Sequence, residues 1–150
     1  MALDGSSRTA VDPVLARTLA FAIEGASKPK RDIARETGLH KDSLLGVIRG
    51  TRAVTTDEAI RLFGAVGVPP HGVLALALSG QEVLAVDWMR RDMGQFWEEL
   101  LLTLPAALSQ ALGEDVSEIR PRWAAGTSRL VAKLVAEHVR DVVNRDLSLR

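Results

Sequence analysis

Apolar residues recur three and four positions apart along most of this chain, which is the spacing of one face of an α-helix. Alanine and leucine dominate these stripes. No stretch shows the strict alternation of apolar and polar residues, flanked by turn residues, that indicates a β-strand. The pattern therefore predicts an all-α protein.

Five short helices are predicted before residue 80, because each apolar stripe lies between residues that begin or end a helix. Asp12-Pro13 is an N-cap followed by proline at the first helical position. Thr55 and Glu58 have the spacing of a capping box. The predicted helices run from Pro13 to Gly25, from Pro29 to Gly38, over residues 41–49, from Thr55 to Gly67 and from Pro69 to Gly80.

The pattern changes after Glu82. A longer amphipathic helix is predicted from there to Leu104, with Pro105 restarting or kinking it and Gly113 ending it. A last helix, capped by Thr127, carries valines and leucines on one side. We expect a boundary near residues 79–82. It would separate a domain over residues 13–80 from a C-terminal region of two to three helices over residues 82–150.

Composition places the chain among globular proteins. Its 150 residues suffice for one or two domains with a core, and 47% hydrophobic with 25% charged residues excludes a disordered polar chain. The absence of cysteine excludes disulfides and thiolate metal sites, and it agrees with a reducing cytoplasm.

Charge is unevenly distributed, although the net charge is zero. Residues 27–52 carry seven Lys/Arg against three Asp/Glu, residues 82–115 carry two against seven, and residues 117–150 carry seven against four. A basic segment in a neutral chain indicates an anionic partner. Ordinary solvated helix faces would give the same imbalance.

The sequence gives no indication of a membrane partner. Its first residues lack the basic start and apolar run of a secretory signal. Residues 62–81 contain no charged residue, close to the ~20 needed to span a bilayer. However, Pro69, Pro70 and four glycines divide this stretch into two short helices. We interpret the stretch as core and expect a cytoplasmic protein.

No catalytic motif is found. His40, His71 and His138 are scattered, without the spacing of a metal site, and no P-loop, nucleophile elbow or dinucleotide-binding glycine motif occurs. Glu98 and Glu99 are assigned to a solvated helix face. We expect no enzymatic activity and no cofactor.

Counted from Lys30, the chain has a hydrophobic residue at the fourth position, a small residue at the fifth, glycine at the ninth and hydrophobic residues at the tenth, fifteenth and eighteenth. These residues are Ile33, Ala34, Gly38, Leu39, Leu44 and Val47. The pattern resembles the helix-turn-helix of the phage-repressor and Cro type, the XRE family, although Thr37 replaces an apolar residue. The segment 49–69 resembles the usual sequel in that family. The resemblance covers residues 13–80 and implies a five-helix repressor-like DNA-binding domain.

That resemblance implies which residues contact DNA. The second helix of this fold crosses the DNA backbone, and the third enters the major groove by its N-terminal end. Leu44 and Val47 would fix the third helix from behind. The residues expected to read bases are Lys41, Asp42, Ser43, Leu45, Gly46 and Arg49. The residues expected to hold phosphates are Ser27, Lys28, Lys30, Arg31, His40, Thr51 and Arg52.

Several of these residues have a second possible role. Lys41 and Arg49 could contact a base or a phosphate, and Asp42 could accept from cytosine or complement the helix dipole. Glycine inside a helix costs about 1 kcal/mol relative to alanine. Close approach to the DNA groove at Gly46 would offset that cost. His40 could cap the third helix or touch the DNA backbone.

We therefore expect a transcriptional regulator that binds double-stranded DNA as a homodimer through residues 82–150 and reads a pseudo-palindromic operator. A repressor is favoured over an activator that contacts RNA polymerase. The alternative is an antitoxin that neutralises a toxin through its C-terminal half and regulates its own operon. Two other roles of residues 82–150 stay open. One is an intramolecular hairpin that covers the core, and the other is an effector pocket lined by Trp88, Phe96, Trp97 and Trp123.

Overall fold

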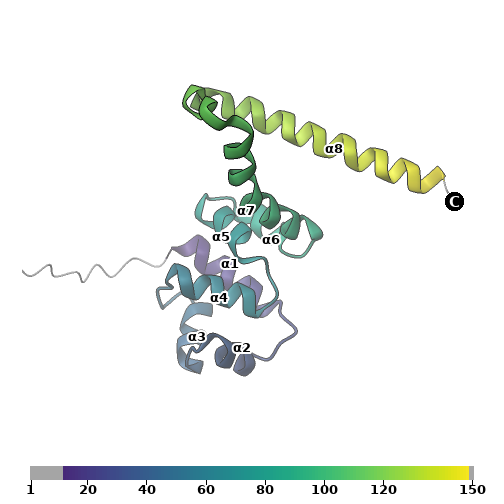
Figure 1. Ribbon diagram of the computed structural model, residues 1–150. Helices are drawn as coiled ribbons and strands as arrows, with labels where there is room; N and C mark the ends of the chain where they lie inside the picture. The colour runs from purple at the N-terminus through teal and green to yellow at the C-terminus, as the bar shows by residue number, and fades with distance from the viewer. Residues whose placement is uncertain (1–11, 149–150) are drawn as a thin grey trace, which may run out of the picture. The chain divides into compact units, whose positions relative to one another are not determined.

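A computed structural model describes residues 12–148, and all regular secondary structure in that part is helical (Figure 1). The α-helices are α1 (Pro13–Glu24), α2 (Lys30–Thr37), α3 (Lys41–Ile48), α4 (Thr56–Ala65), α5 (Pro70–Leu78), α6 (Glu82–Trp88), α7 (Asp92–Leu112) and α8 (Ala124–Ser148). Two 3-10 turns, η1 (Gly113–Glu118) and η2 (Pro121–Trp123), lie between α7 and α8. The expected all-α fold is confirmed.

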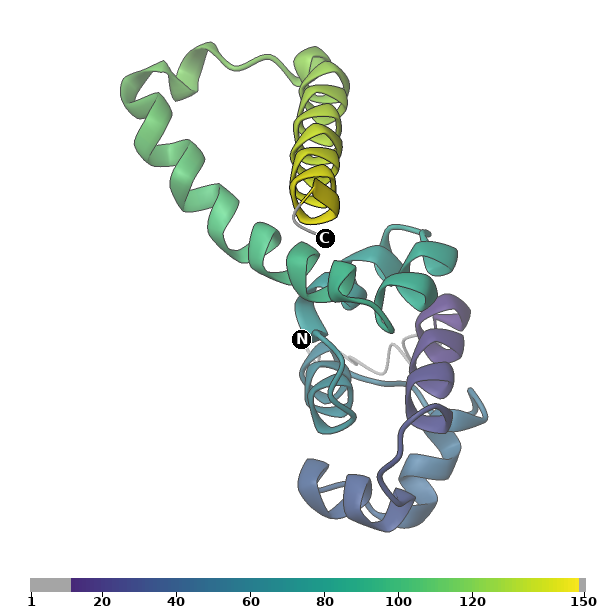
Figure 2. The same cartoon turned by 90° about the vertical axis from the view of Figure 1, so that its right-hand side faces the viewer.

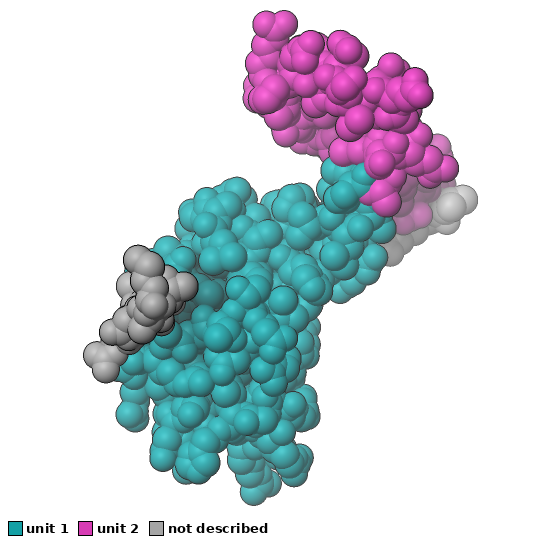
Figure 3. All heavy atoms as spheres, turned by 60° about the vertical axis from the view of Figure 1, so that its left-hand side comes forward, with its two compact units in different colours: residues 1–105 teal, residues 106–150 magenta. Residues whose placement is uncertain are grey.

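The chain divides into two compact units, unit 1 over residues 1–105 and unit 2 over residues 106–150 (Figure 3). The division differs from the expected boundary near residues 79–82, because α6 and the first part of α7 pack on the helices before them. Ala85 of α6 is fully buried, and Glu82 forms a two-bond ion pair with Arg17 of α1, at 2.8 and 3.0 Å.

The ends of the helices in unit 1 follow from local residue chemistry. The Asp12 carboxylate accepts the backbone N–H groups of Val14 and Leu15, so it caps α1. At α4, both hydrogen bonds of the Thr55–Glu58 capping box are present. These two predicted caps are confirmed.

The core of unit 1 is built from the apolar stripes of its helices. The side chains that are less than 2% exposed include Leu19, Ile33, Leu44, Val47, Leu62, Phe63 and Val73. Each such burial contributes about 1.5–3 kcal/mol. The core therefore draws on all of the first five helices and fixes α2 and α3 on α1 and α4.

The long helix expected from Glu82 onward is interrupted at residues 89–91, and α6 and α7 are separate helices. Gly94 explains the sharp turn between them. A Cβ atom built on Gly94 would lie 2.5 Å from the carbonyl oxygen of Trp88, so only glycine permits this approach. Within the turn, the Arg90 guanidinium lies over the ring of Phe21, 4.1 Å from its centroid, and this contact joins the turn to α1.

The first part of α7 is attached to α5 through polar contacts. Glu98 is 6% exposed, and its carboxylate accepts the backbone N–H groups of His71 and Gly72. Trp97 donates its indole N–H to the carbonyl of Gly72, at 3.1 Å. The assignment of Glu98 to a solvated helix face is therefore wrong, whereas Glu99 is exposed.

Unit 2 contains the end of α7, the two 3-10 turns and α8, and none of its described residues is buried. Pro105 lies inside α7, which continues to Leu112. The expected cap at Thr127 is wrong, since α8 begins at Ala124 and the Thr127 hydroxyl donates to the carbonyl of Trp123 inside the helix. Among the described residues, no helix is long and apolar enough to cross a membrane.

Candidate nucleic-acid interface

Helices α2 and α3 lie together at one end of unit 1, and α6 and the start of α7 lie at the other (Figure 1, Figure 2). A tight turn joins α2 to α3. It begins with Gly38, whose φ of 71° is left-handed, and the N–H of Leu39 donates to the carbonyl of Ala34 at 3.0 Å. The predicted glycine stop is confirmed at this position.

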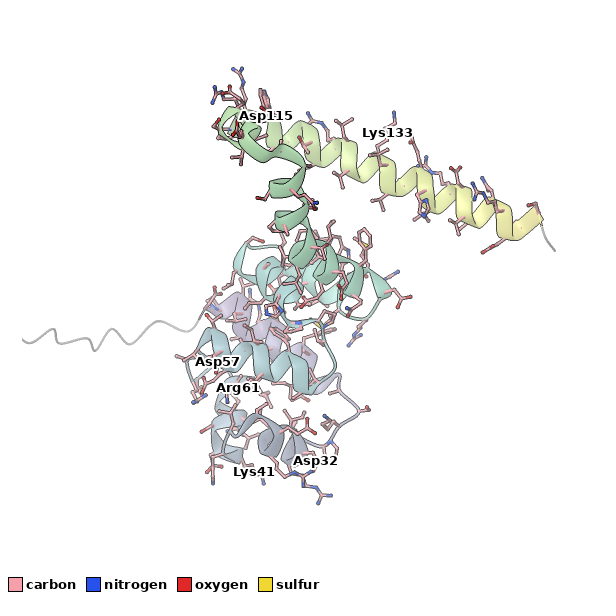
Figure 4. All side chains as sticks on the ribbon, viewed as in Figure 1. Asp32, Lys41, Asp57, Arg61, Asp115 and Lys133 are labelled. Atoms are coloured by element: carbon pink, nitrogen blue, oxygen red, sulfur yellow. The ribbon has the colours of Figure 1, made fainter. Side chains whose placement is uncertain are left out.

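One side of α3 is fixed in the core, and the other is open. Leu44 and Val47 are 1% and 0% exposed. In contrast, His40, Lys41, Asp42 and Arg49 are exposed, and Ser43, Leu45 and Gly46 are half-buried. Figure 4 shows the exposed Lys41 at the end of unit 1 that α2 and α3 form.

His40 occupies the N-cap position of α3. Its ring nitrogen Nδ1 accepts the backbone N–H of Asp42 at 3.4 Å, and it lies 3.8 Å from the Asp42 carboxylate. His40 therefore fills the capping role, one of the two that the sequence left open. Asp42 lies in the first turn of α3, where a negative charge complements the helix dipole.

Gly46 has a contact within its own chain that accounts for the glycine. A Cβ atom at this position would lie 3.1 Å from Cβ of Arg52 and 3.6 Å from the Thr51 hydroxyl. The Thr51 hydroxyl also donates to the Gly46 carbonyl at 3.3 Å. The glycine therefore lets the segment after α3 pack against it, without any need for contact with DNA.

Arg52 forms an ion pair that connects the segment after α3 to α4. Its guanidinium donates to both carboxylate oxygens of Glu58, at 3.0 and 3.4 Å, and Glu58 also accepts the backbone N–H of Thr55. The hydrogen bond from Arg52 is the largest cause of a lowered Glu58 pKa, which desolvation partly opposes. The Arg52 side chain is 36% exposed, and the ion pair with Glu58 is the contact that holds its guanidinium in place.

Two other residues of the expected phosphate set are also held within unit 1. Lys28 donates to Glu36 at 2.7 Å and to the carbonyl of Ala65, at the last residue of α4, at 2.8 Å. Lys30 pairs with Glu24 at 3.0 Å. These ion pairs are partly exposed, and DNA phosphates would compete with the carboxylates for the same ammonium groups.

The remaining basic residues of the set are more open. Arg31 is 86% exposed and lies 3.8 Å from Asp32, a weak contact. Within residues 12–148, neither Lys41 nor Arg49 takes part in an ion pair. Ser27 and Thr51 are exposed neutral residues. Lys41, Arg49 and Arg31 are therefore the cations of the set most available to an anion.

Arg17 is a further basic residue on the same side of unit 1 as Arg49, and it does not belong to the expected DNA-contacting set. Both arginines line a shallow hollow of about 300 Å³ between α1 and the end of α3, together with Gly50 and Pro13. The hydrogen bond to Glu82 raises the Arg17 pKa, and the main contact of this guanidinium is therefore the ion pair that joins α1 to α6. No sequence signal predicts the contact between Arg17 and Glu82, because these two residues lie 65 positions apart.

Neither a protein-family model, nor a curated protein, nor a solved structure matches this chain. Support for a nucleic-acid interface therefore comes from the residues of α2, α3 and the segment that follows α3.

Proposed function

We propose that unit 1 binds double-stranded DNA with α3 in the major groove, and that the protein is a sequence-specific transcriptional regulator acting as a repressor. The observation that carries this proposal is the position of α3. Leu44 and Val47 hold it rigidly from behind, while Lys41 and Asp42 at its N-terminal end remain uncovered. Such a regulator would act on chromosomal DNA in the cytoplasm.

The size and chemistry of α3 suit this role. Its eight residues form a rod about 12 Å long, close to the width of the major groove. Lys41 can donate to O6 and N7 of guanine, and Asp42 can accept from N4 of cytosine. Ser43 and Leu45 are half-buried, so they offer less contact surface to the bases than Lys41 and Asp42 do.

The basic residues at the start of α2 would hold the DNA backbone. Arg31 follows the first residue of α2 and is almost fully exposed, so it is the best candidate for a phosphate contact. Each phosphate neutralised by such a residue makes the logarithm of the affinity fall with the logarithm of salt concentration, with a slope of about −0.9. Phosphate contacts fix orientation but do not select sequence.

The test is selection of bound sequences from random DNA by the wild type and by single variants. Lys41→Ala is expected to change which bases are preferred. Arg31→Ala is expected to weaken all sites similarly and to reduce the salt slope by about one. Arg31 is a sharper probe than Arg52, because Arg52→Ala also breaks the ion pair with Glu58.

Arg91→Ala serves as the charge-matched control, since Arg91 is an exposed arginine between α6 and α7, at the end of unit 1 opposite to α3. It should change neither the preference nor the salt slope. The proposal fails if joint replacement of Lys41, Asp42 and Ser43 leaves the selected sequences unaltered. It also fails if the wild type selects no sequence at all.

A further inference from the structure

Unit 2 carries most of the uncovered apolar residues of the described chain. Of the 17 large hydrophobic side chains that are exposed in residues 12–148, 11 belong to unit 2. Seven of these lie on α8, namely Leu130, Val131, Leu134, Val139, Val142, Val143 and Leu147. We call these seven residues the α8 apolar set. Folded monomers rarely expose apolar patches larger than a few hundred Å².

Unit 2 has no means of its own to stabilise a fold. Its described part, residues 106–148, is close to the size of about 40 residues below which chains usually need disulfides, metals or association. The chain contains no cysteine, and the described residues contain no group of side chains that could hold a metal ion. Association with another polypeptide surface is the remaining route.

The positions in the α8 apolar set require more than one neighbouring helix. Leu130 and Val139 are nine residues apart, as are Leu134 and Val143. Nine residues at about 100° each place the members of a pair on opposite sides of the helix. Besides the two short 3-10 turns, unit 2 itself supplies only the end of α7, residues 106–112, which is about 10 Å long, whereas α8 is about 37 Å long. That segment is too short to cover α8.

The available area matches what a second copy would need. Complete burial of a leucine or valine side chain contributes about 1.5–3 kcal/mol at about 25 cal/mol per Å², so a half-exposed one offers roughly 30–60 Å² of apolar surface. The 11 side chains of unit 2 then offer on the order of 300–700 Å². A standard interface buries about 800 Å² per partner, of which roughly 500 Å² is apolar in a homodimer. A two-fold pair uses the same surface on both copies, so another unit 2 supplies an equal apolar area.

We propose that unit 2 is covered by unit 2 of a second copy of this chain, with α8 packed along the partner's α8. The pairing narrows the dimer interface expected over residues 82–150 to residues 106–150, since residues 82–105 belong to unit 1. It rests on the proposed function for its biological purpose, because two copies present two α3 helices to two half-sites about 10 bp or a multiple apart. Its test requires no DNA.

Sedimentation equilibrium of the full chain, across low to high micromolar concentration, measures the pairing directly. The wild type is expected at twice its 16.2 kDa mass. Val139→Glu and Leu134→Glu, on different sides of α8, are each expected to raise the dimer dissociation constant on the order of 100-fold, because a charge would be buried. Val83→Glu is the matched control, since Val83 is 82% exposed on α6 of unit 1, and it should leave the dimer unchanged.

A second measurement does not depend on the stability of the glutamate variants. Because the chain has no cysteine, a single cysteine at Ser128, Ala132 or Ala136 reports the approach of α8 to its copy. At least one of these three variants should form a disulfide-linked dimer on oxidation, whereas Val83→Cys should not.

A wild type that stays monomeric at every concentration overturns the proposal, whether unit 2 then packs on its own unit 1 or on a partner such as a toxin. A dimer that survives both α8 glutamates, or that only Val83→Glu weakens, also overturns it. A wild type that dimerises but shows no sequence-selective binding to DNA would contradict the proposed function and leave the pairing of unit 2 supported. The two failures are therefore distinguishable.

Discussion

Glu98 of α7 and Gly72 of α5 are joined by a hydrogen bond between a buried carboxylate and a backbone N–H, although 26 residues separate them in the chain. Glu98 also accepts from the backbone and the ring of His71, so it caps the N-terminal end of α5 from another helix. Gly72 is required at this contact, because a Cβ atom there would lie 2.7 Å from the Trp97 ring. These contacts make the start of α7 a structural part of unit 1.

Glu98→Ala is expected to lower the free energy of unfolding of unit 1 by about 1–3 kcal/mol, because two backbone N–H groups at the start of α5 lose their acceptor. Urea denaturation followed by tryptophan fluorescence measures the change, since Trp97 lies beside the contact. Glu99→Ala is the control, because Glu99 is exposed and its side chain accepts only from Gln95, on the same helix. Equal effects of the two substitutions would contradict the capping role of Glu98.

Gly38→Ala and Gly64→Ala are expected to change stability in opposite directions. Neither glycine has an atom near the position of an added Cβ, but Gly38 has a φ of 71° whereas Gly64 lies inside α4. Alanine at residue 38 should cost about 1–2 kcal/mol, because L-residues are strained in the left-handed region. Alanine at residue 64 should stabilise by about 0.5–1 kcal/mol. Thermal unfolding of the full-length variants measures both effects, and a stabilised Gly38→Ala protein would disprove the strain.

The ion pair between Arg52 and Glu58 should make part of the stability of unit 1 depend on pH. The folded state lowers the Glu58 pKa, chiefly through the Arg52 hydrogen bond, so folding favours the ionised carboxylate. This contribution is complete above the ordinary glutamate pKa of about 4.3 and is lost as the pH falls through the lowered value.

Glu58→Gln keeps an acceptor for the capping box but removes the charge, so it should destabilise unit 1 by about 1 kcal/mol at neutral pH. The difference from wild type should shrink at acid pH, where the wild-type carboxylate is protonated. Urea denaturation at a series of pH values measures this convergence. Arg52→Ala should remove the same pH-dependent part of the stability. A difference in unfolding free energy between wild type and Glu58→Gln that stays constant at all pH values would contradict the role of the Glu58 charge.

The helix boundaries of unit 1 were predictable because their signals are local. Asp12 and Thr55 each cap a helix through backbone groups two or three residues away. Gly38 ends α2 through its own φ angle. Such signals depend on neighbouring residues alone, so periodicity and capping rules place these ends within one or two residues of the structure.

The contacts that the sequence did not predict depend on residues far apart in the chain or on the spatial path of the backbone. Glu98 follows the same spacing rules as the exposed Glu99, and only the position of α5 distinguishes them. The break before Gly94 is absent from the apolar periodicity, which continues across it. In the candidate interface, the exposed side of α3 was predictable, whereas the contact of Gly46 with Arg52 depends on how the following segment folds back.

The cap that Glu98 places on α5 determines where this protein can be cut. A gene fragment that stops after residue 80 would encode every helix of the predicted DNA-binding domain. It would nevertheless lack Glu98, the acceptor for the backbone N–H groups at the start of α5, and Trp97, whose indole packs on Gly72. A fusion of the proposed DNA-binding unit to a foreign oligomer should therefore include the chain through Pro105, the last residue of unit 1.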